Sequence, residues 1–437
     1  MPSRIRSTAL AATLAPVAAA TLLFSQGAMA QATSSVQLYG IVDAGVTRVS
    51  GLTAGNVTQL ASGIMEGSRW GLRGTEDLGG GYRAIFTLEN RFEVDTGSLS
   101  SRPISGTQFL PTRLQTPEAL GVGASGTAVA PGVTLGNVVT NVNNGLASES
   151  LGVNVGSTGN RLFDRQAFVG LITPYGAVLA GRQYTPVFEI VANFDSMKTQ
   201  SALGANQVAS FPLSLDIRVS NAVQYRVQQG GFTANLMVGF GEADTATTNN
   251  VNEFYGFMAM YKGDSYSVGA GYNTRKNDVG LKSLTNVSLG GSLNVGPGTL
   301  GVLYVTNEDK NPSVNSIRTN SSLGGLASTL ANAYARALQQ DGKLFHIGYQ
   351  VPFGASTVTF SVNSFNDGTA ANADARSFGV AYTYALSKRT DLNAVVARVN
   401  NSANSQIALG GNGYQGGYTR AAGVDSTSVA LGIRHRF

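Results

Sequence analysis

The side chains of this sequence whose types and spacing let them act together are arginines. Arg69 and Arg73 lie four residues apart, so in an extended strand both point to the same face. Arg91 lies opposite Arg69 if the chain forms a hairpin that turns at Gly79–Gly81, where glycine adopts positive φ at no steric cost. Guanidinium groups gathered on one face attract anions by their charge, without any covalent step.

Residues for covalent catalysis or metal binding are scarce. The chain has no cysteine and 2 histidines, His346 and His435, and neither has a Cys, His or carboxylate partner at ligand spacing. A G-x-S-x-G elbow and a Walker loop are both missing, and no helical pattern follows the glycines at 79–81. We therefore expect no enzyme activity, no metal and no cofactor.

Composition narrows the class of protein. Glycine accounts for 55 of 437 residues and charged residues for 13%, against usual shares of about 7% and about 25%. Lys and Arg are scattered singly, which argues against a nucleic-acid partner. Beyond the N-terminal segment, no stretch of about 18 uninterrupted apolar residues occurs, so membrane-spanning helices are excluded. Many glycines and few charges favour a barrel of strands and tight turns that shows apolar side chains to lipid.

The first 30 residues have the features of a Sec-type signal peptide. Arg4 and Arg6 precede an apolar run over about 9–24, and the small-residue site Ala28-Met29-Ala30 follows. The apolar run is shorter than the roughly 20 residues that a transmembrane helix needs. We expect cleavage after residue 30 and a mature domain over 31–437.

Alternation of apolar and polar side chains predicts sixteen strands. In one of them, Tyr82, Ala84, Phe86 and Leu88 share a parity, while charged and polar residues take the other. The alternation is poor at 253–262 and 299–308, so the count could differ by two. The predicted strands cover about 35–47, 68–78, 82–93, 161–173, 177–184, 218–228, 231–242, 253–262, 264–275, 284–295, 299–308, 342–351, 355–365, 376–387, 389–399 and 425–437.

Connections between these strands alternate in length. Along the chain, short turns alternate with longer loops. The turns include Gly79–Gly81 and Pro174–Gly176, and the loops include 51–67, 98–160 and 185–217. Antiparallel strands joined in this way place all short turns at one rim and all loops at the other, as in outer-membrane barrels. The predicted fold is an all-β, 16-stranded antiparallel transmembrane barrel. It must close on itself, because an unsatisfied backbone group in hydrocarbon costs several kcal/mol.

Four segments resemble a known family. They are VQLYGIVDAGV from Val36, SRWGLRGTEDLGGGYRAIFTLE from Ser68, DRQAFVGLITPYGAVLAGRQYTP from Asp164 and the terminal GIRHRF. Together they resemble the trimeric general porins of the Gram-negative β-proteobacterial outer membrane, over the whole mature chain. The stretch 98–160, predicted to be the second loop, is longer than that family leads us to expect.

The resemblance implies a function, a location and partners. It implies a homotrimer in outer-membrane lipid, with a third loop folded into each lumen. Small hydrophilic solutes and ions would pass by passive diffusion, with a leaning toward anions. It also implies that Phe437 belongs to the signal read by the outer-membrane assembly machinery.

The pore constriction can be assigned on this basis. The third loop, 185–217, would supply the acidic residues Glu189 and Asp195. The facing basic wall would hold Arg69, Arg73 and Arg91, joined by Arg218 at the start of the sixth strand. Arg182 shares its parity with outward-facing residues, so it points inward only if its strand pairing contains a bulge. The basic wall is therefore predicted to comprise Arg69, Arg73, Arg91, Arg182 and Arg218.

Alternatives from other classes remain open at this point. A substrate-specific channel or an adhesin would use the long loops 98–160, 309–341 and 400–424 for recognition. A secreted solenoid or sandwich would need a regular repeat, which the sequence lacks, and gives no reason for alternating loop lengths.

Overall fold

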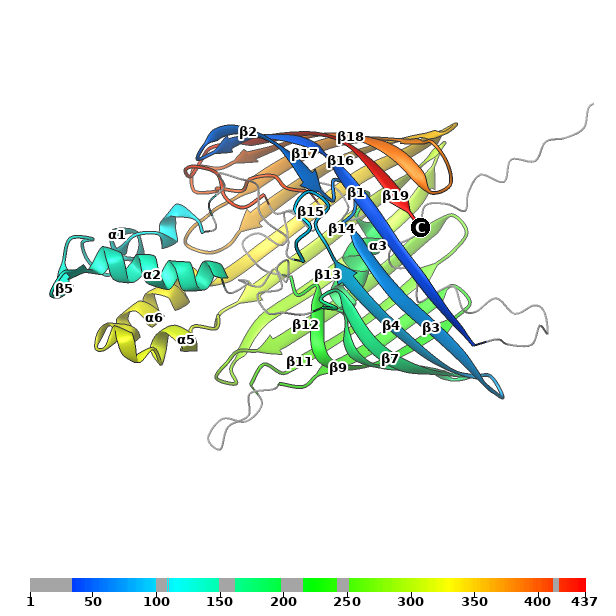
Figure 1. Ribbon diagram of the computed structural model, residues 1–437, viewed down its shortest axis with the longest axis horizontal. Coiled ribbons are helices and arrows are strands. Elements are labelled where there is room, and N and C mark those ends of the chain that lie inside the picture. The colour runs from blue at the N-terminus through cyan, green and yellow to red at the C-terminus, as the bar shows by residue number, and fades with distance from the viewer. Residues whose placement is uncertain are drawn as a thin grey trace, which may run out of the picture.

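The computed structural model describes residues 34–99, 108, 110–148, 162–197, 215–241, 251–411 and 416–437, and the expected signal peptide lies outside these ranges. The described strands form one antiparallel sheet that closes into a barrel, tilted against its long axis (Figure 1). Its members are β1 (Ser35–Leu52), β2 (Gly55–Ser62), β3 (Arg69–Gly79), β4 (Tyr82–Arg91), β7 (Gln166–Thr173), β8 (Gly176–Tyr184), β9 (Arg218–Gln229), β10 (Phe232–Gly239), β11 (Phe254–Lys262), β12 (Tyr266–Lys276), β13 (Lys282–Val295), β14 (Gly298–Asp309), β15 (Gln340–Phe353), β16 (Ser356–Asp367), β17 (Ala375–Ala385), β18 (Thr390–Asn401) and β19 (Ser426–Arg436).

The first and last strands close the barrel. Residues 41–49 of β1 pair with residues 436–428 of β19. Gly40 and Phe437 extend this seam, since each donates its backbone N–H to the carbonyl of the other at 3.1 Å. The sheet therefore has no open edge along this seam, which satisfies the backbone groups that hydrocarbon could not. The prediction of a closed, sixteen-stranded antiparallel barrel is confirmed.

One predicted loop is in fact partly a strand. Residues 51–67 were expected to form a polar loop, but β2 lies within them and pairs with the second half of β1. The first half of β1 pairs with β3, so β2 and β3 share one of the sixteen places in the barrel. Apolar and polar side chains alternate over only a few residues of β2, and this pattern stops after the strand. The strand was therefore not recognised in the sequence.

The lengths of the connections alternate as predicted. Short turns join β3 to β4, β7 to β8, β9 to β10, β11 to β12, β13 to β14, β15 to β16 and β17 to β18. The first of these turns uses Gly79, Gly80 and Gly81, with φ of 80°, 62° and 84°, a conformation that favours glycine. We call the opposite end, which carries the longer connections, the loop rim.

Apolar and polar side chains are distributed between the outside and the inside in the opposite way from those of a water-soluble protein. The outward parity carries apolar residues that are exposed, whereas the inward parity carries polar residues that are mostly buried. None of the described helices combines the length and the apolar character needed to span a membrane. Exposed outward-facing residues include Leu38, Leu236, Phe257, Leu289, Phe345, Phe360, Val396, Leu431 and Ile433.

Two long loops build a separate helical cap beyond the loop rim (Figure 1). The side chains of Leu114, Val139, Ile317, Leu330 and Tyr334 form its apolar core. The Tyr334 hydroxyl donates to Asn143 Oδ1 at 2.7 Å, which ties the two loops together. The loop-rim cap comprises η2 (Thr112–Leu114), α1 (Pro117–Leu120), β5 (Ala128–Ala130), β6 (Val133–Thr134) and α2 (Leu135–Ser148) from one loop, and α5 (Asn315–Arg318), η3 (Ser321–Leu323) and α6 (Leu326–Ala337) from the other.

Close packing at the closing seam can be tested at Gly45. A Cβ at this position would lie 2.2 Å from the carbonyl oxygen of Leu431 and 2.6 Å from Cα of Gly432. Gly45→Ala should therefore lower the free energy of unfolding by about 1–3 kcal/mol, as overpacking does. The measurement is the urea midpoint of the barrel refolded in lipid vesicles. Gly291→Ala is the matched control, because its Cβ would meet no atom closer than 3.6 Å; equal midpoints for the two variants would contradict the argument.

Candidate functional site

A short helix lies inside the barrel. Helix α3 (Pro186–Phe194) begins at Thr185, whose Oγ1 accepts the backbone N–H of Phe188 at 3.3 Å, and proline occupies its first turn. Val187, Ile190 and Phe194 repeat at helical spacing and are buried against the inner face of the strands from β11 to β14. The helix therefore narrows the lumen from one side.

The acidic residues of this segment are held against the wall. Glu189 Oε2 accepts from Arg226 Nη1 of β9 at 2.7 Å, and Glu189 Oε1 accepts from Asn235 Nδ2 of β10 at 3.3 Å. Asp195 ends the helix and is fully buried, with Oδ1 accepting the Met197 N–H at 2.9 Å. Both predicted acids thus lie in the segment inside the barrel, and the charge of Glu189 is compensated by Arg226.

On the other side of the lumen, arginines and carboxylates alternate along the wall. Glu66, in the segment between β2 and β3, accepts from Arg69 Nη2 at 2.6 Å, from Arg434 Nη1 at 2.9 Å and from Arg436 Nη2 at 2.7 Å. Both Arg434 and Arg436 also donate to Asp391 of β18, each at 3.0 Å. These ion pairs connect β18, β19 and β3.

Further ion pairs and hydrogen bonds extend this network from β4 to β9. Glu89 of β4 lies 3.9 Å from Arg69 Nε and accepts from Arg165 Nε at 2.7 Å. Arg165 Nη2 donates to the hydroxyl of Tyr184 at 2.9 Å. Arg218 donates to the same hydroxyl at 3.3 Å, with its guanidinium 4.7 Å from the centre of the Tyr184 ring. The wall from β18 to β9 is therefore one connected polar surface.

This surface carries an excess of positive charge. Among the described residues that these contacts connect, five arginines face three carboxylates. Each carboxylate holds its arginines in place. Because these side chains are already ordered, the passage of an ion costs them no further side-chain entropy. The members of the arginine wall are Arg69, Arg165, Arg218, Arg434 and Arg436, with Glu66, Glu89 and Asp391 as the carboxylates.

The structure places the remaining predicted arginines near this wall. Arg73 lies on the inward parity, donates to Gln37 Oε1 at 2.9 and 2.7 Å, and sits 5.1 Å from the ring centre of Tyr39. Arg91 is buried, and its Nε lies 3.9 Å from Asp164 Oδ2. Arg73 is more exposed than Arg91, so it is the one that solutes in the lumen can approach.

Arg182 depends on an irregularity in its strand pairing. The register of β8 against β9 shifts between Gly181 and Gln183, and Asn221 on β9 has a φ of 50°. Arg182 is buried and donates to the backbone carbonyl of Asp164 at 2.5 Å and to Ser220 Oγ at 2.9 Å. Arg182 therefore links its own strand to the segment before β7 and to β9.

Sequence reasoning missed the segment that carries Glu66. The carboxylate of Asp43 on β1 accepts the backbone N–H groups of Ile64, Met65 and Glu66 at 3.0, 2.9 and 2.8 Å. These bonds fold the segment between β2 and β3 inward and point Glu66 at the arginines. The available signal was the break in alternation after Ser62, combined with Asp43 as an isolated carboxylate on the inward parity of β1.

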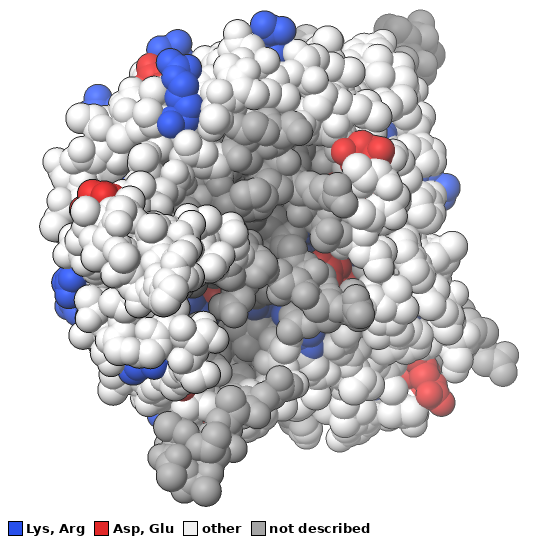
Figure 2. Space-filling view, turned by 60° about the vertical axis from the view of Figure 1, so that its left-hand side comes forward, with Lys and Arg blue, Asp and Glu red and all other residues white. Residues whose placement is uncertain are grey.

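Charged side chains lie around the opening at the loop rim and also inside it. Figure 2 shows a mostly uncharged surface with separate charged patches around the rim, and a hollowed centre in which charges of both signs are also visible. Among the described residues, no group of three His, Cys, Asp or Glu side chains is arranged to hold a metal ion. The arrangement suits attraction of ions by charge.

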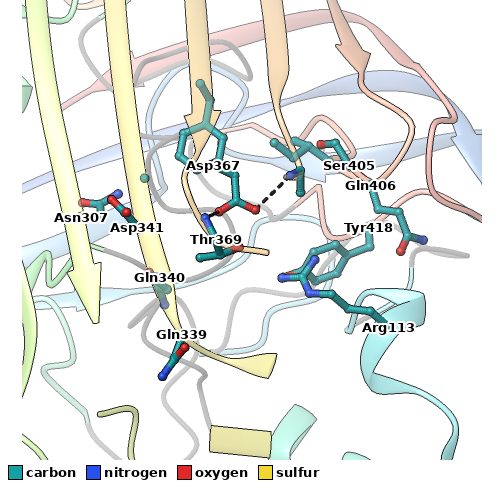
Figure 3. Close-up of a pocket in the computed structure, with 14 residues that line it drawn as sticks. Arg113, Asn307, Gln339, Gln340, Asp341, Asp367, Thr369, Ser405, Gln406 and Tyr418 are labelled. Carbon is teal, nitrogen blue, oxygen red and sulfur yellow. Dashed lines mark hydrogen bonds between the residues drawn. The ribbon is translucent and has the colours of Figure 1, made fainter. Parts of the chain in front are cut away.

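A pocket at the loop rim lies where the cap meets the barrel (Figure 3). Gln406 Oε1 accepts the Thr112 backbone N–H at 2.7 Å, which fastens the cap to the last loop. Asp367 accepts the backbone N–H groups of Thr369 and Ala373, each at 3.0 Å, and so shapes its own loop. The pocket is lined by Arg113, Asn307, Gln339, Gln340, Asp341, Gly342, Phe365, Asp367, Thr369, Ala373, Ser405, Gln406, Ile407 and Tyr418.

One carboxyl near the loop rim should make ion selectivity depend on pH. Glu93 continues the inward parity of Glu89 and Arg91. Burial raises its pKa to about 7; the Arg91 charge opposes this rise, and the Asp95 charge adds to it. A carboxyl with a raised pKa is neutral below that value and negative above it. We expect the preference for anions to fall as pH rises from about 6 to about 8, by less than about two-fold because one charge changes. Reversal potentials in a salt gradient measure it.

Glu93→Gln is the variant that isolates this group. It should show a weaker pH dependence of the permeability ratio than wild type across the same range, while Glu76→Gln, an exposed carboxylate on β3, should retain the wild-type dependence. An undiminished pH dependence in Glu93→Gln would rule Glu93 out as its source.

Comparisons with known proteins agree with the geometry. The family model described as Gram-negative porin matches residues 9–404. The outer membrane porin protein 32 of Delftia acidovorans is 27% identical over 432 residues, which cover 96% of this chain and 99% of that protein.

Solved structures share the fold. The anion-selective porin from Comamonas acidovorans superimposes with a TM-score of 0.67 at 24% identity, covering 93% of this chain and 100% of that one. The trimer form of OmpT, an outer membrane protein of Vibrio cholerae, gives a TM-score of 0.54 at 13% identity, covering 93% and 100% of the two chains.

Proposed function

Because this chain belongs to the Gram-negative porin family and so forms a channel in the outer membrane, we propose that its channel prefers anions. Members of this family are channels, which confirms the expectation that the chain is not an enzyme. The single observation that supports anion preference is the arginine wall, in which five arginines face three carboxylates in the part of the chain that the structure describes. A relative in fold is described as anion-selective, which is consistent with this proposal.

The strength of the attraction suits passage rather than tight binding. An anion about 5 Å from one guanidinium gains roughly 0.8 kcal/mol in water, and salt at about 0.1 M reduces this gain by roughly 40%. Each accessible arginine then favours anions by roughly two-fold. Such weak attraction changes which ion enters and still lets the ion leave, as conduction requires.

The constriction is proposed to lie between α3 and the arginine wall. The described part of the third loop, with α3, packs against β11 to β14, while the arginines come from β19, β3 and the strands up to β9. Glu189 and Asp195 would then act mainly by holding α3 to the barrel. Arg73, the predicted arginine most open to the lumen, would attract ions directly. Arg69 would contribute its charge to the electrostatic potential of the arginine wall.

Assembly as a homotrimer is part of the proposal. The fold relative described as a trimer form supports it. Phe437, whose ring is exposed on the outer face at the end of β19, is proposed as the residue read by the outer-membrane assembly machinery. The cap, fastened to the rim through Gln406, would shield one side of the channel entrance rather than act as an adhesin.

Neutralising Arg69 and Arg73 together tests the function. Arg69→Gln with Arg73→Gln should lower the anion-to-cation permeability ratio by at least roughly two-fold at about 0.1 M salt, which is the share of the accessible Arg73, with a smaller further reduction from the loss of the buried Arg69 charge. The ratio comes from the reversal potential of purified protein in a planar bilayer with a salt gradient.

Arg48→Gln is the matched control, because Arg48 is exposed on the outward parity of β1 and donates to Thr58 Oγ1 at 3.2 Å. It should leave the ratio unchanged. A wild-type channel that prefers cations would overturn the proposed function, and a double variant with the wild-type ratio would remove these two arginines from it.

A further inference from the structure

Six glycines line the inner wall beneath α3. They lie on five adjacent strands and follow the path of the helix across the barrel. None of them has a positive φ, so the backbone conformation alone does not call for glycine. Glycine in a strand interior weakens the strand, and its presence here needs another reason. The residues are Gly256 on β11, Gly269 and Gly271 on β12, Gly290 on β13, Gly301 on β14 and Gly348 on β15.

The reason is the closeness of the helix. A Cβ on Gly290 would lie 2.2 Å from Cδ2 and 2.8 Å from Cβ of Phe194. A Cβ on Gly269 would lie 2.9 Å from Ile190 Cδ1, and one on Gly271 would lie 3.1 Å from both Ile190 Cγ1 and Val187 Cα. Real Cβ atoms essentially never approach within 3.0 Å, so a side chain on Gly290, which would meet Phe194 next to the helix backbone, would push the helix away from the wall, while Gly269 and Gly271 leave little room for one.

The end of the helix is fastened to the same wall. A Cβ on Gly348 would lie 2.5 Å from Cβ of Ser196, the second residue after α3. The backbone N–H of Ser196 donates to His346 Nε2 at 3.1 Å, which leaves His346 Nδ1 to donate to Asn363 Oδ1 at 2.8 Å. His346 is completely buried, which gives this histidine a structural role that its sequence position did not reveal.

We propose that these glycines form a seat that fixes the position of α3 and thereby sets the width of the channel, with Gly290 as the principal positioning residue. The seat lets the helix lie close to the barrel wall. His346 fixes the end of the helix by binding Ser196. The inference rests on the proposed function in one respect, namely that α3 borders the conducting path.

Gly290→Val tests the seat. It should displace Phe194 and α3 toward the lumen, so that single-channel conductance falls and the largest polyethylene glycol that enters the channel becomes smaller. Gly291→Val is the control, because Gly291 is the next residue on β13 and shares the outward parity of Leu289 and Leu293. The control should conduct like wild type. A Gly290→Val channel that also conducts like wild type would overturn the proposal.

A second pair of variants tests the contact itself. Phe194→Trp overfills the seat from the helix side and leaves every barrel strand unchanged, so it should lower conductance even if Gly290→Val does not fold. Phe194→Ala combined with Gly290→Val replaces the ring by the valine methyl groups and should restore conductance toward wild type. Effects that simply add in the double variant would show that the two residues do not act through one contact, and would contradict the seat.

Asn193→Trp separates this inference from the function on which it rests. Asn193 is the one residue of α3 that is not buried, and it lies on a different face from Phe194. A bulky side chain there should reduce conductance if α3 borders the channel, whatever holds the helix. Reduced conductance in Asn193→Trp with an unchanged Gly290→Val channel would overturn the seat alone. Unchanged conductance in both would contradict the placement of the constriction as well.

Discussion

The whole structure depends on one constraint, which is that backbone N–H and C=O groups in hydrocarbon must find partners within the protein. A sheet satisfies it only by closing, and β1 closes onto β19 through nine consecutive residue pairs. Sixteen strand places make a ring too wide for side chains to fill. The lumen therefore holds water, and the polar residues that lipid excludes are collected on its wall.

A wide lumen becomes selective only where something narrows it and gives it charge. Helix α3 narrows it from one side, and Glu189 and Arg226 join it to the wall by an ion pair. The arginines occupy the facing side, where Glu66 and Glu89 keep them ordered. Because the glycine seat lets α3 lie close to its own side, the narrowing and the charge come from opposite halves of the same barrel.

The sequence revealed the barrel more completely than the constriction. Alternation along most of the strands, with alternating turn and loop lengths, led to the prediction of sixteen strands, because both signals are local. Strand β2 escaped because its pairing is broken after a few residues. The roles of Asp43, Glu66 and His346 depend on contacts between residues far apart in the chain, which periodicity cannot report. The pairing of Glu189 with Arg226 was missed for the same reason.

The central claim, that anions pass between α3 and an arginine wall, can be tested most directly by locating anions in the channel. Crystals soaked in bromide and measured at the bromine absorption edge would show where anions collect. The account predicts anomalous peaks in the lumen beside Arg73 and the arginines that run from β19 to β9. Peaks confined to the outer surface, or a lumen with none beside these arginines, would contradict it.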